Sequence, residues 1–399
     1  MKVALVTDSM SAFGGAERVI EQILRIFPQA DIFAVLDLVP KLERGFLGAH
    51  TITTSFLQKL PAVKFYYRKL LHFWPIAVEQ IDVTGYDLVL SSHHSVAYGV
   101  LTNPDQIHVS YVHTPMRYAW DLQHEYLRSA HLEHGLLGLA ARRTLHKARI
   151  WDYAAAQRPD ALVTNSHFVA RRLHRTHRRD VTVIYPPVSV QNFEVQNKGD
   201  YYISVGRLVP YKRVDLLARA FARMPERRLK IVGTGPELKK LSALQVPNVE
   251  VLGYQSDEVV RDLLSGARAF LFAGIEDFGI TAVEAQAAGT PVIAYGCGGL
   301  TETVLDLSTD SQPTGLFFDE QSEDAIVDAV HSFEANRERF TPEACISNAE
   351  RFSDQRFRSA FSAFVHRAVS QQRRNKMAFS SHVTPHRQPA LVPNRFSAD

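Results

Sequence analysis

The sequence predicts an α/β protein made of two doubly wound domains whose parallel sheets face each other across a central cleft. Its 399 residues are more than one hydrophobic core ordinarily holds, which favours two domains. Short apolar runs alternate with helical patterns in both halves, as expected for parallel sheets covered by helices on both faces. Between the halves, Pro186 and Pro187 precede a polar stretch, and proline restricts itself and its predecessor to extended conformations. This segment is therefore expected to be a linker.

The N-terminal half is expected to form the first domain, residues 1–187. Its first helix is predicted at residues 17–26, where apolar residues recur on one helical face. Strand-like apolar runs precede and follow this helix. They occupy residues 2–7, 31–36, 87–91, 107–112 and 161–165.

After a linker at residues 188–200, the same alternation predicts a second domain at residues 201–370, whose last helix can pack back on the first domain. Its strands are expected at residues 201–205, 228–232, 249–252, 269–272 and 291–293. Its helices are expected at residues 214–223, 256–267, 281–288 and 322–333. Residues 371–399 lack periodicity and contain three prolines, which predicts a disordered basic tail.

Composition excludes several classes of protein. Two cysteines, Cys297 and Cys345, are too few for a disulfide framework or a four-ligand zinc site, and they favour a reducing, cytoplasmic setting. No apolar run approaches the roughly 18–20 residues that span a bilayer, and Asp8 interrupts the first one too early for a signal peptide. The net charge is only +3, but residues 1–190 hold 21 Lys and Arg against 16 Asp and Glu. That excess is either a solvated basic face or a surface for an anionic partner.

Two glycine turns that follow predicted strands are candidate ligand loops. Gly14 and Gly15 open the first helix, where glycine lets a ligand approach the backbone and the helix N-terminus favours anions. Gly233 lies in a second turn between a strand and a helix. An ordinary tight turn explains either of them equally well.

A pair of cations follows another predicted strand. Gly206 and Arg207 end the strand, and Lys212 comes just before the next helix. Fixed positive charge at the mouth of a sheet suits a diphosphate, whose negative charge grows as it leaves. A solvated loop remains the alternative interpretation.

The most specific feature is a pair of glutamates, Glu276 and Glu284, that flank a glycine-containing loop and the start of a helix. The helix N-terminus between them offers free backbone N–H groups to a phosphate. One carboxylate can accept hydrogen bonds from sugar hydroxyls and the other from a ribose diol. Two glutamates at arbitrary spacing are common, but this spacing, with Phe278 and Gly279 inside and a strand directly before, is not.

Together these motifs resemble the retaining glycosyltransferases of family four, which have the GT-B fold of two Rossmann-like domains facing a central cleft. The resemblance covers about residues 1–370 and rests on the E-x7-E run, Gly206-Arg207 with Lys212, and Gly14-Gly15. The stretch HTPMRYAWD at residues 113–121 is similar to bacterial O-antigen and exopolysaccharide mannosyltransferases. The resemblance implies transfer of a hexose, mannose from GDP-mannose, onto a glycan or lipid-linked saccharide in cell-surface polysaccharide synthesis.

The resemblance also implies a set of site residues. Glu284 would bind the donor ribose, Glu276 and His113 would contact the transferred sugar, and Gly15 would approach the phosphates or the acceptor. The implied catalytic residues are His113, Glu276, Arg207 and Lys212. The implied donor-binding residues are Gly14, Gly15, Gly206, Arg207, Lys212, Gly233, Glu276, Phe278, Gly279, Ile280, Thr281 and Glu284.

No metal and no resident cofactor are expected. The sequence contains no Asp-x-Asp, the arrangement by which metal-dependent transferases hold a divalent ion, and Arg207 and Lys212 can supply the compensating charge. A double displacement needs a carboxylate nucleophile beneath the anomeric carbon, and the sequence identifies none. The resemblance implies instead a same-face substitution in which the departing diphosphate takes the acceptor's proton.

The expected partners are a nucleotide-sugar donor and a glycan or polyprenyl-diphosphate-linked acceptor, with peripheral contact to the inner face of an anionic membrane. Residues 64–74 interleave cations with aromatic side chains, and residues 128–149 combine cations with leucines, which suits a headgroup interface. The alternative is that these aromatic residues belong to the core.

Other functions remain open on the sequence alone. Within the same fold, the alternatives are a UDP-sugar-dependent transferase, a nucleotide-sugar epimerase, a phosphorylase or a non-catalytic nucleotide-sugar binder. A nucleic-acid binder is the alternative from a different class, although no nucleic-acid partner is expected. It would use the basic cluster Arg171, Arg172, His174, Arg175, His177, Arg178 and Arg179, which has no accompanying aromatic platform.

Overall fold

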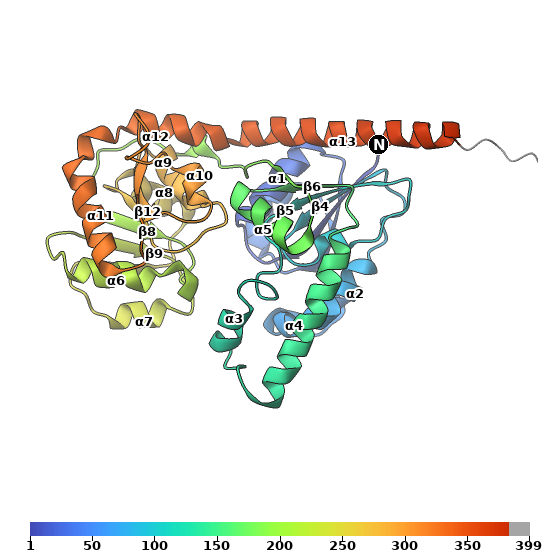
Figure 1. Cartoon of the computed structure of the whole chain (residues 1–399), viewed down its shortest axis with the longest axis horizontal. Coiled ribbons are helices and arrows are strands. Elements are labelled where there is room, and N and C mark those ends of the chain that lie inside the picture. Colours follow the sequence, from blue (N-terminus) through green and yellow to red (C-terminus); the bar gives the residue numbers. More distant parts are fainter. Residues whose placement is uncertain (383–399) are drawn as a thin grey trace, which may run out of the picture.

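The structure is a computed structural model that describes residues 1–382, with side chains described as far as residue 374. It contains two parallel β-sheets, one in each half of the chain (Figure 1). The first has seven strands in the order β3-β2-β1-β4-β5-β6-β7. These are β1 Val3–Met10, β2 Asp31–Asp37, β3 Ile52–Thr54, β4 Leu88–His93, β5 Ile107–Val112, β6 Ala161–Thr164 and β7 Thr182–Val183.

The second sheet has six strands in the order β10-β9-β8-β11-β12-β13. They are β8 Tyr202–Val205, β9 Leu229–Val232, β10 Val249–Gly253, β11 Phe270–Phe272, β12 Val292–Tyr295 and β13 Gly315–Phe318. Strand order reverses beside β1 in the first sheet and beside β8 in the second. Such switch points are where open α/β sheets bind ligands, at the carboxyl ends of their strands.

Helices cover both sheets, as predicted. The N-terminal domain contains α1 Gly15–Ile26, α2 Trp74–Glu79, α3 Gln123–Ser129, α4 Gly135–Ala155 and α5 His167–His177. The C-terminal half contains α6 Val214–Ala222, α7 Leu238–Ala243, α8 Asp257–Ser265, α9 Ile280–Ala287, α10 Leu300–Thr303, α11 Glu323–Ala335, α12 Pro342–Ala349 and α13 Asp354–His382. Each strand and helix expected from the sequence forms, with ends displaced by a few residues. The short edge strands β3, β7 and β13 were not expected, because two to four residues carry little periodicity.

The segment between the domains is a packed hinge. Val188 and Val190 are buried with Phe278 and Phe352 in one apolar cluster. The Val188 amide also donates to the Phe352 carbonyl at 2.9 Å. The chain therefore crosses between the domains twice at the same place.

The last helix, α13, runs along both domains and packs on the first one (Figure 1). Its Phe357, Phe361, Val365 and Val369 are buried in the same core as the central strands of the N-terminal sheet. The helix continues through His382, so the expectation of a disordered tail from residue 371 is wrong for residues 371–382. The residues that this helix buries, Phe357 to Val369, precede the stretch at 371–382, which therefore extends a helix that is already anchored by packing. Residues 383–399 lie outside the described part of the chain.

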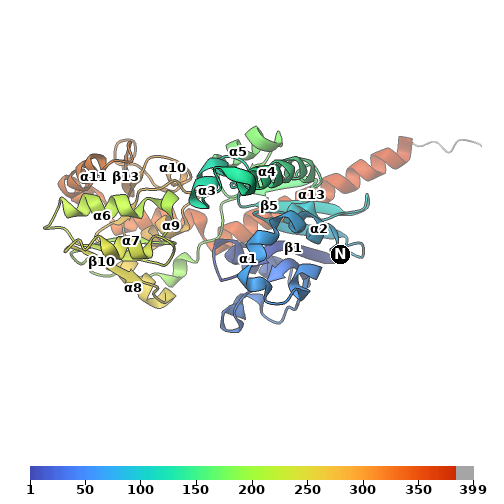
Figure 2. The ribbon, with the colours of Figure 1, turned by 90° about the horizontal axis from the view of Figure 1, so that it is seen from below.

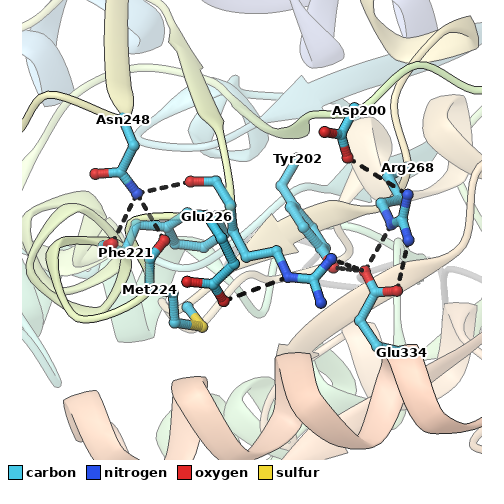
Figure 3. Close-up of polar contacts among 9 residues, drawn as sticks. Asp200, Tyr202, Phe221, Met224, Glu226, Asn248, Arg268 and Glu334 are labelled. Carbon is cyan, nitrogen blue, oxygen red and sulfur yellow. Dashed lines mark hydrogen bonds and ion pairs between the residues drawn. The ribbon is translucent and has the colours of Figure 1, made fainter.

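A polar cluster ties α11 to the end of the second sheet that lies away from the other domain. Glu334 accepts hydrogen bonds from the hydroxyl of Tyr202 and, at 2.6 Å each, from Nε and Nη2 of Arg268 (Figure 3). Asn248 donates to three carbonyls in and after the last turn of α6, including that of Met224 at 2.9 Å (Figure 3). These contacts hold α11 and the end of α6 against the sheet.

Helix α4 projects from the N-terminal domain, away from α13 (Figure 1). At its start, Leu136, Leu137 and Leu139 are exposed, Leu136 by 85%. Within residues 1–382, no helix is long and apolar enough to cross a lipid bilayer.

Candidate active site

A cavity of about 300 Å³ lies between the two domains, at the carboxyl ends of both sheets. Several of its lining residues directly follow a strand: His94 follows β4, His113 follows β5, and Asn165 follows β6. From the other domain come Val205 at the end of β8 and Phe272 at the end of β11. Of the residues predicted from sequence, the cavity brings together Gly15, His113, Lys212, Glu276, Phe278, Gly279, Ile280 and Thr281.

Two helix N-termini meet at this cavity, α1 from the first domain and α9 from the second. A Cβ atom on Gly15 would lie 2.8 Å from Cδ1 of Ile280, so only glycine permits this approach without a shift. Gly279, which precedes α9, has φ +93°, a conformation that side chains rarely adopt. The first-turn amides of both helices have no partner within their own helix. Their partial positive charge makes the cavity suited to an anion.

Lys212 and Glu276 form an ion pair on the wall of the cavity, with Lys212 Nζ 2.8 Å from Glu276 Oε1. Arg207, predicted beside them, is exposed outside the cavity lining and donates to the Tyr211 hydroxyl at 3.3 Å. The structure therefore brings Lys212 into the cavity lining and leaves Arg207 outside that lining.

The glycines behind this wall serve packing. Gly233 has φ +140°, and a Cβ atom on it would lie 1.9 Å from the Gly206 carbonyl oxygen. A Cβ atom on Gly206 would in turn lie 3.0 Å from Lys212 Nζ. Gly233 does not line the cavity, and neither does Gly14, which caps α1 while its amide donates to Glu17 at 3.1 Å.

Glu284 lies one turn into α9 and lines a second cavity, of about 320 Å³, that lies on another side of the domain boundary. Its carboxylate pairs across the boundary with Arg18 of α1, Oε1 to Nη1 at 2.9 Å. Burial raises the pKa of Glu284, while the neighbouring Arg18 acts in the opposite direction. The two glutamates of the motif thus line different cavities, and each is paired with a cation.

His113 is held by Ser92, whose Oγ lies 2.9 Å from its Nε2. Burial, with a further effect from nearby His94, lowers the pKa of His113 to about 3. The imidazole is therefore uncharged near neutral pH and can donate or accept a hydrogen bond in the cavity.

Sequence reasoning missed His94 and the residue that positions it. Asp8, fully buried in β1, accepts hydrogen bonds from the four consecutive amides of residues 94–97. This carboxylate shapes the loop that brings His94 to the cavity. A charged residue inside an otherwise apolar strand was the available signal, because such a residue is seldom buried without partners.

The basic cluster on α5 does not form one surface for nucleic acid. His177 is buried, and its Nε2 lies 2.8 Å from Asp152 Oδ2. Arg179 donates to the carbonyls of Ala156 and Pro159. Arg172 contacts the opposite domain, so these three basic residues are used inside the protein.

Comparison with known proteins agrees with this geometry. Residues 13–192 match the family described as Glycosyltransferase Family 4, and residues 189–352 match the family described as Glycosyl transferases group 1. The chain has the GT-B fold of two Rossmann-like domains, and the two matches together span residues 13–352. The predicted fold class is thereby confirmed.

Relatives of this GT-B chain include an uncharacterized glycosyltransferase of Methanocaldococcus jannaschii. It is 32% identical over 180 residues, which are 43% of this chain and 50% of that protein. The D-inositol 3-phosphate glycosyltransferase of Mycobacteroides abscessus is 30% identical over 220 residues, 49% of this chain and 48% of that protein. The chain therefore matches about half the length of these curated relatives.

Solved structures share the fold over nearly the whole GT-B chain. Anabaena HepE in complex with UDP has a TM-score of 0.66 and 17% identity, over 92% of this chain and 100% of that one. Sucrose-phosphate synthase from Thermosynechococcus elongatus has a TM-score of 0.69 and 16% identity, over 93% and 100%.

The depressed pKa of His113 leads to a direct test. We expect its ring proton signals to stay constant from pH 8 to about pH 5, because a group with pKa about 3 remains uncharged there. Histidine-labelled protein followed by NMR measures this, with the His113→Gln variant identifying the signal. A titration midpoint for that signal above pH 5 would contradict the predicted burial of the imidazole.

Proposed function

We propose that the protein transfers a hexosyl group from a nucleotide-diphosphate sugar to a glycan acceptor. The observation that carries this proposal is the cavity where the N-termini of α1 and α9 converge beside Lys212 and Glu276. Positive potential for a diphosphate thus lies next to a carboxylate and an uncharged histidine suited to sugar hydroxyls. The two family matches support the same activity.

In this proposal each residue binds a particular part of the donor. The amides of Ile280 and Thr281, with Lys212, bind the diphosphate, and Arg207 reaches it from outside the cavity lining. Glu276 and His113 hold the transferred sugar, and Glu284 accepts hydrogen bonds from the ribose diol after its pairing with Arg18 rearranges. The cationic groups stabilise the negative charge that develops on the leaving diphosphate. Electrostatic stabilisation of such a developing charge is usually the largest contribution to catalysis.

The proposed reaction is a same-face substitution with retention of configuration. The bond between the anomeric carbon and the diphosphate oxygen breaks, and a bond from the acceptor hydroxyl oxygen to that carbon forms. The acceptor's proton passes to the departing diphosphate, so the products are the glycosylated acceptor and a nucleoside diphosphate. Charge compensation by Lys212, Arg207 and the helix N-termini makes the step independent of a metal ion in this proposal.

GDP-mannose is the proposed donor, and the resemblance of residues 113–121 to polysaccharide mannosyltransferases supports it. A UDP-sugar is the second candidate. It is favoured by the complexes of Anabaena HepE, which shares this fold, with UDP and with UDP-glucose.

A donor panel in the presence of excess chelator tests the proposal. We expect the purified protein to hydrolyse GDP-mannose faster than UDP-glucose, UDP-N-acetylglucosamine or other GDP-sugars, at a rate unchanged by EDTA. Release of the nucleoside diphosphate is the measurement. A higher kcat/KM with a UDP-sugar would select the second candidate, and activity lost in EDTA and restored by magnesium would overturn metal independence. No turnover of any donor would overturn the transferase proposal.

The ribose role of Glu284 predicts that Glu284→Ala weakens binding of the donor nucleotide while the fold survives. Loss of a charged hydrogen bond costs about 1.5–3 kcal/mol, which corresponds to a roughly 10- to 150-fold higher Kd. Titration calorimetry measures this, with Glu284→Gln as the isosteric variant and the exposed Glu338→Ala as the control. Wild-type affinity in Glu284→Ala would contradict the role.

We also propose that the protein docks on an anionic cytoplasmic membrane face to reach a polyprenyl-diphosphate-linked acceptor. Exposed leucines at the start of α4 are followed by exposed Arg142, Arg143 and Lys147 on the same helix. Phe65, 77% exposed, has Lys64 4.9 Å from its ring centroid. Apolar side chains beside cations suit a headgroup interface.

Residues 64–74 and helix α4 share one core cluster, but fewer of their side chains are free to contact a membrane than the sequence indicated. Trp74 is buried, and Tyr66, Tyr67, Leu70 and Leu71 are partly buried. They pack on the same core cluster as Leu145, Ala148 and Trp151 of α4. Part of the aromatic stretch at residues 64–74 therefore belongs to the core, which was the alternative interpretation of this sequence.

Membrane docking predicts binding to anionic liposomes at low salt that high salt releases. Each cation near such a surface contributes about 1 kcal/mol, so changing Lys64, Arg68 and Lys69 together to glutamate should abolish co-sedimentation at moderate salt. The matched control changes Lys239, Arg337 and Arg339, exposed cations of the other domain, to glutamate. Binding that ignores salt, or that survives the first triple substitution, would remove the docking proposal.

A further inference from the structure

Helix α5 of the N-terminal domain contacts the C-terminal domain at two separate points. The first is its own N-terminus, where the amides of His167 and Phe168 each donate at 2.8 Å to one oxygen of Glu302. Glu302 belongs to α10, which lies on the side of its domain that faces α5 (Figure 2). A carboxylate at a helix N-terminus is favoured by the helix dipole, and here it comes from the opposite domain.

The second contact is made by Arg172, one turn further along α5. Its Nη1 atom lies 2.7 Å from Asp277 Oδ1, in the loop that carries Glu276. The same Nη1 donates to Thr114 Oγ1 at 3.1 Å, directly after His113. One guanidinium therefore bonds to the neighbours of both proposed sugar-contacting residues, one from each domain.

Further contacts hold this guanidinium in place. Its Nε atom lies 3.2 Å from Asp121 Oδ2, its Cζ lies 4.8 Å from the Phe168 ring centroid, and its side chain is only 11% exposed. Arg117 is also near Asp277, but at 3.7 Å it is beyond hydrogen-bond distance. Arg172 is thus the main link between the stretch at residues 113–121 and the loop that carries Glu276, which is called the donor loop below.

We propose that Arg172 is a positioning residue that aligns His113 with Glu276 when the two domains close, and that Glu302 assists by binding the N-terminus of α5. The inference rests on the proposed function, because it concerns the same cavity. Thr114, Asp121 and Phe168 belong to the same domain as Arg172, so Arg172 keeps its contacts with them when the two domains move relative to each other. Only the bond to Asp277 needs the closed arrangement, and only a state-dependent contact shifts a conformational equilibrium.

The kinetic test uses Arg172→Met, which keeps a long apolar stem and removes the guanidinium. We expect kcat for sugar transfer to fall about 10- to 100-fold, the usual consequence of misaligned reacting groups. The Kd for the donor nucleotide should change less than about threefold, because the groups proposed to bind it lie elsewhere. Arg172→Lys, which keeps the charge but not the forked geometry, should recover part of the rate. The control is Arg175→Met, an exposed arginine one turn along the same helix.

A double-mutant cycle tests the cross-domain bond itself. Asp277→Asn should lower kcat to a similar extent, and combining it with Arg172→Met should add little further loss, because both changes remove one interaction. Additive losses would show that the two residues act separately and would overturn the proposal. The proposal is also overturned if the loss of rate in Arg172→Met is fully explained by lower donor affinity and a lower melting temperature. That result would indicate a structural role for Arg172.

Small-angle scattering provides a readout that does not depend on activity. The variant that combines Arg172→Met with Glu302→Gln should have a larger radius of gyration than wild type, with and without GDP or UDP. Equal radii together with a kcat within about twofold of wild type would overturn the inference. If the wild type transfers no sugar from any donor, the proposed function fails, whereas an expanded double variant would still support Arg172 as the residue that closes the cleft.

Discussion

The close approach of two helix N-termini constrains the rest of the cleft. Ile280 of α9 lies against the backbone of Gly15 at the start of α1, where a Cβ atom would be 2.8 Å from the Ile280 Cδ1 atom and would force that side chain to shift. Both helices direct partial positive charge at the same cavity, which favours an anion there. Ion pairs across the boundary, among them Arg18 with Glu284 and Arg172 with Asp277, join the two domains beside this cavity.

The architecture allows this because the chain crosses between the domains twice at one hinge. The linker at Val188 and the end of the second domain at Phe352 are hydrogen-bonded and packed in one apolar cluster. Phe278, from the donor loop, belongs to the same cluster. The loop that carries Glu276 is therefore attached at Phe278 to the hinge and at Asp277 to α5, so its position depends on how the two domains are arranged.

Much of the fold and part of the site could be predicted from sequence, because the relevant signals are local. A strand, a glycine loop and a helix start lie within a dozen residues around Glu276, and the loop that joins the strand to the helix lies at the carboxyl end of the strand. The roles of His94 and Arg172 could not be found in this way, and the charge inside an apolar strand marked Asp8 as unusual without identifying its partners. Each acts through partners dozens of residues away in the sequence, and a single sequence contains no record of such pairings.

The sequence by itself determined two parallel-sheet domains, their linker and the loops at the carboxyl ends of the strands, since periodicity, glycine and proline act over short stretches of chain. Only the tertiary structure decided which loop residues share a cavity. It separated Glu276 from Glu284, left Arg207 outside the cavity lining, and turned part of a basic cluster on α5 into bonds across the domain boundary. The last helix was expected to be able to pack back on the first domain, but only the tertiary structure decided which of its residues form the buried face, because the surface it packs on selects that face.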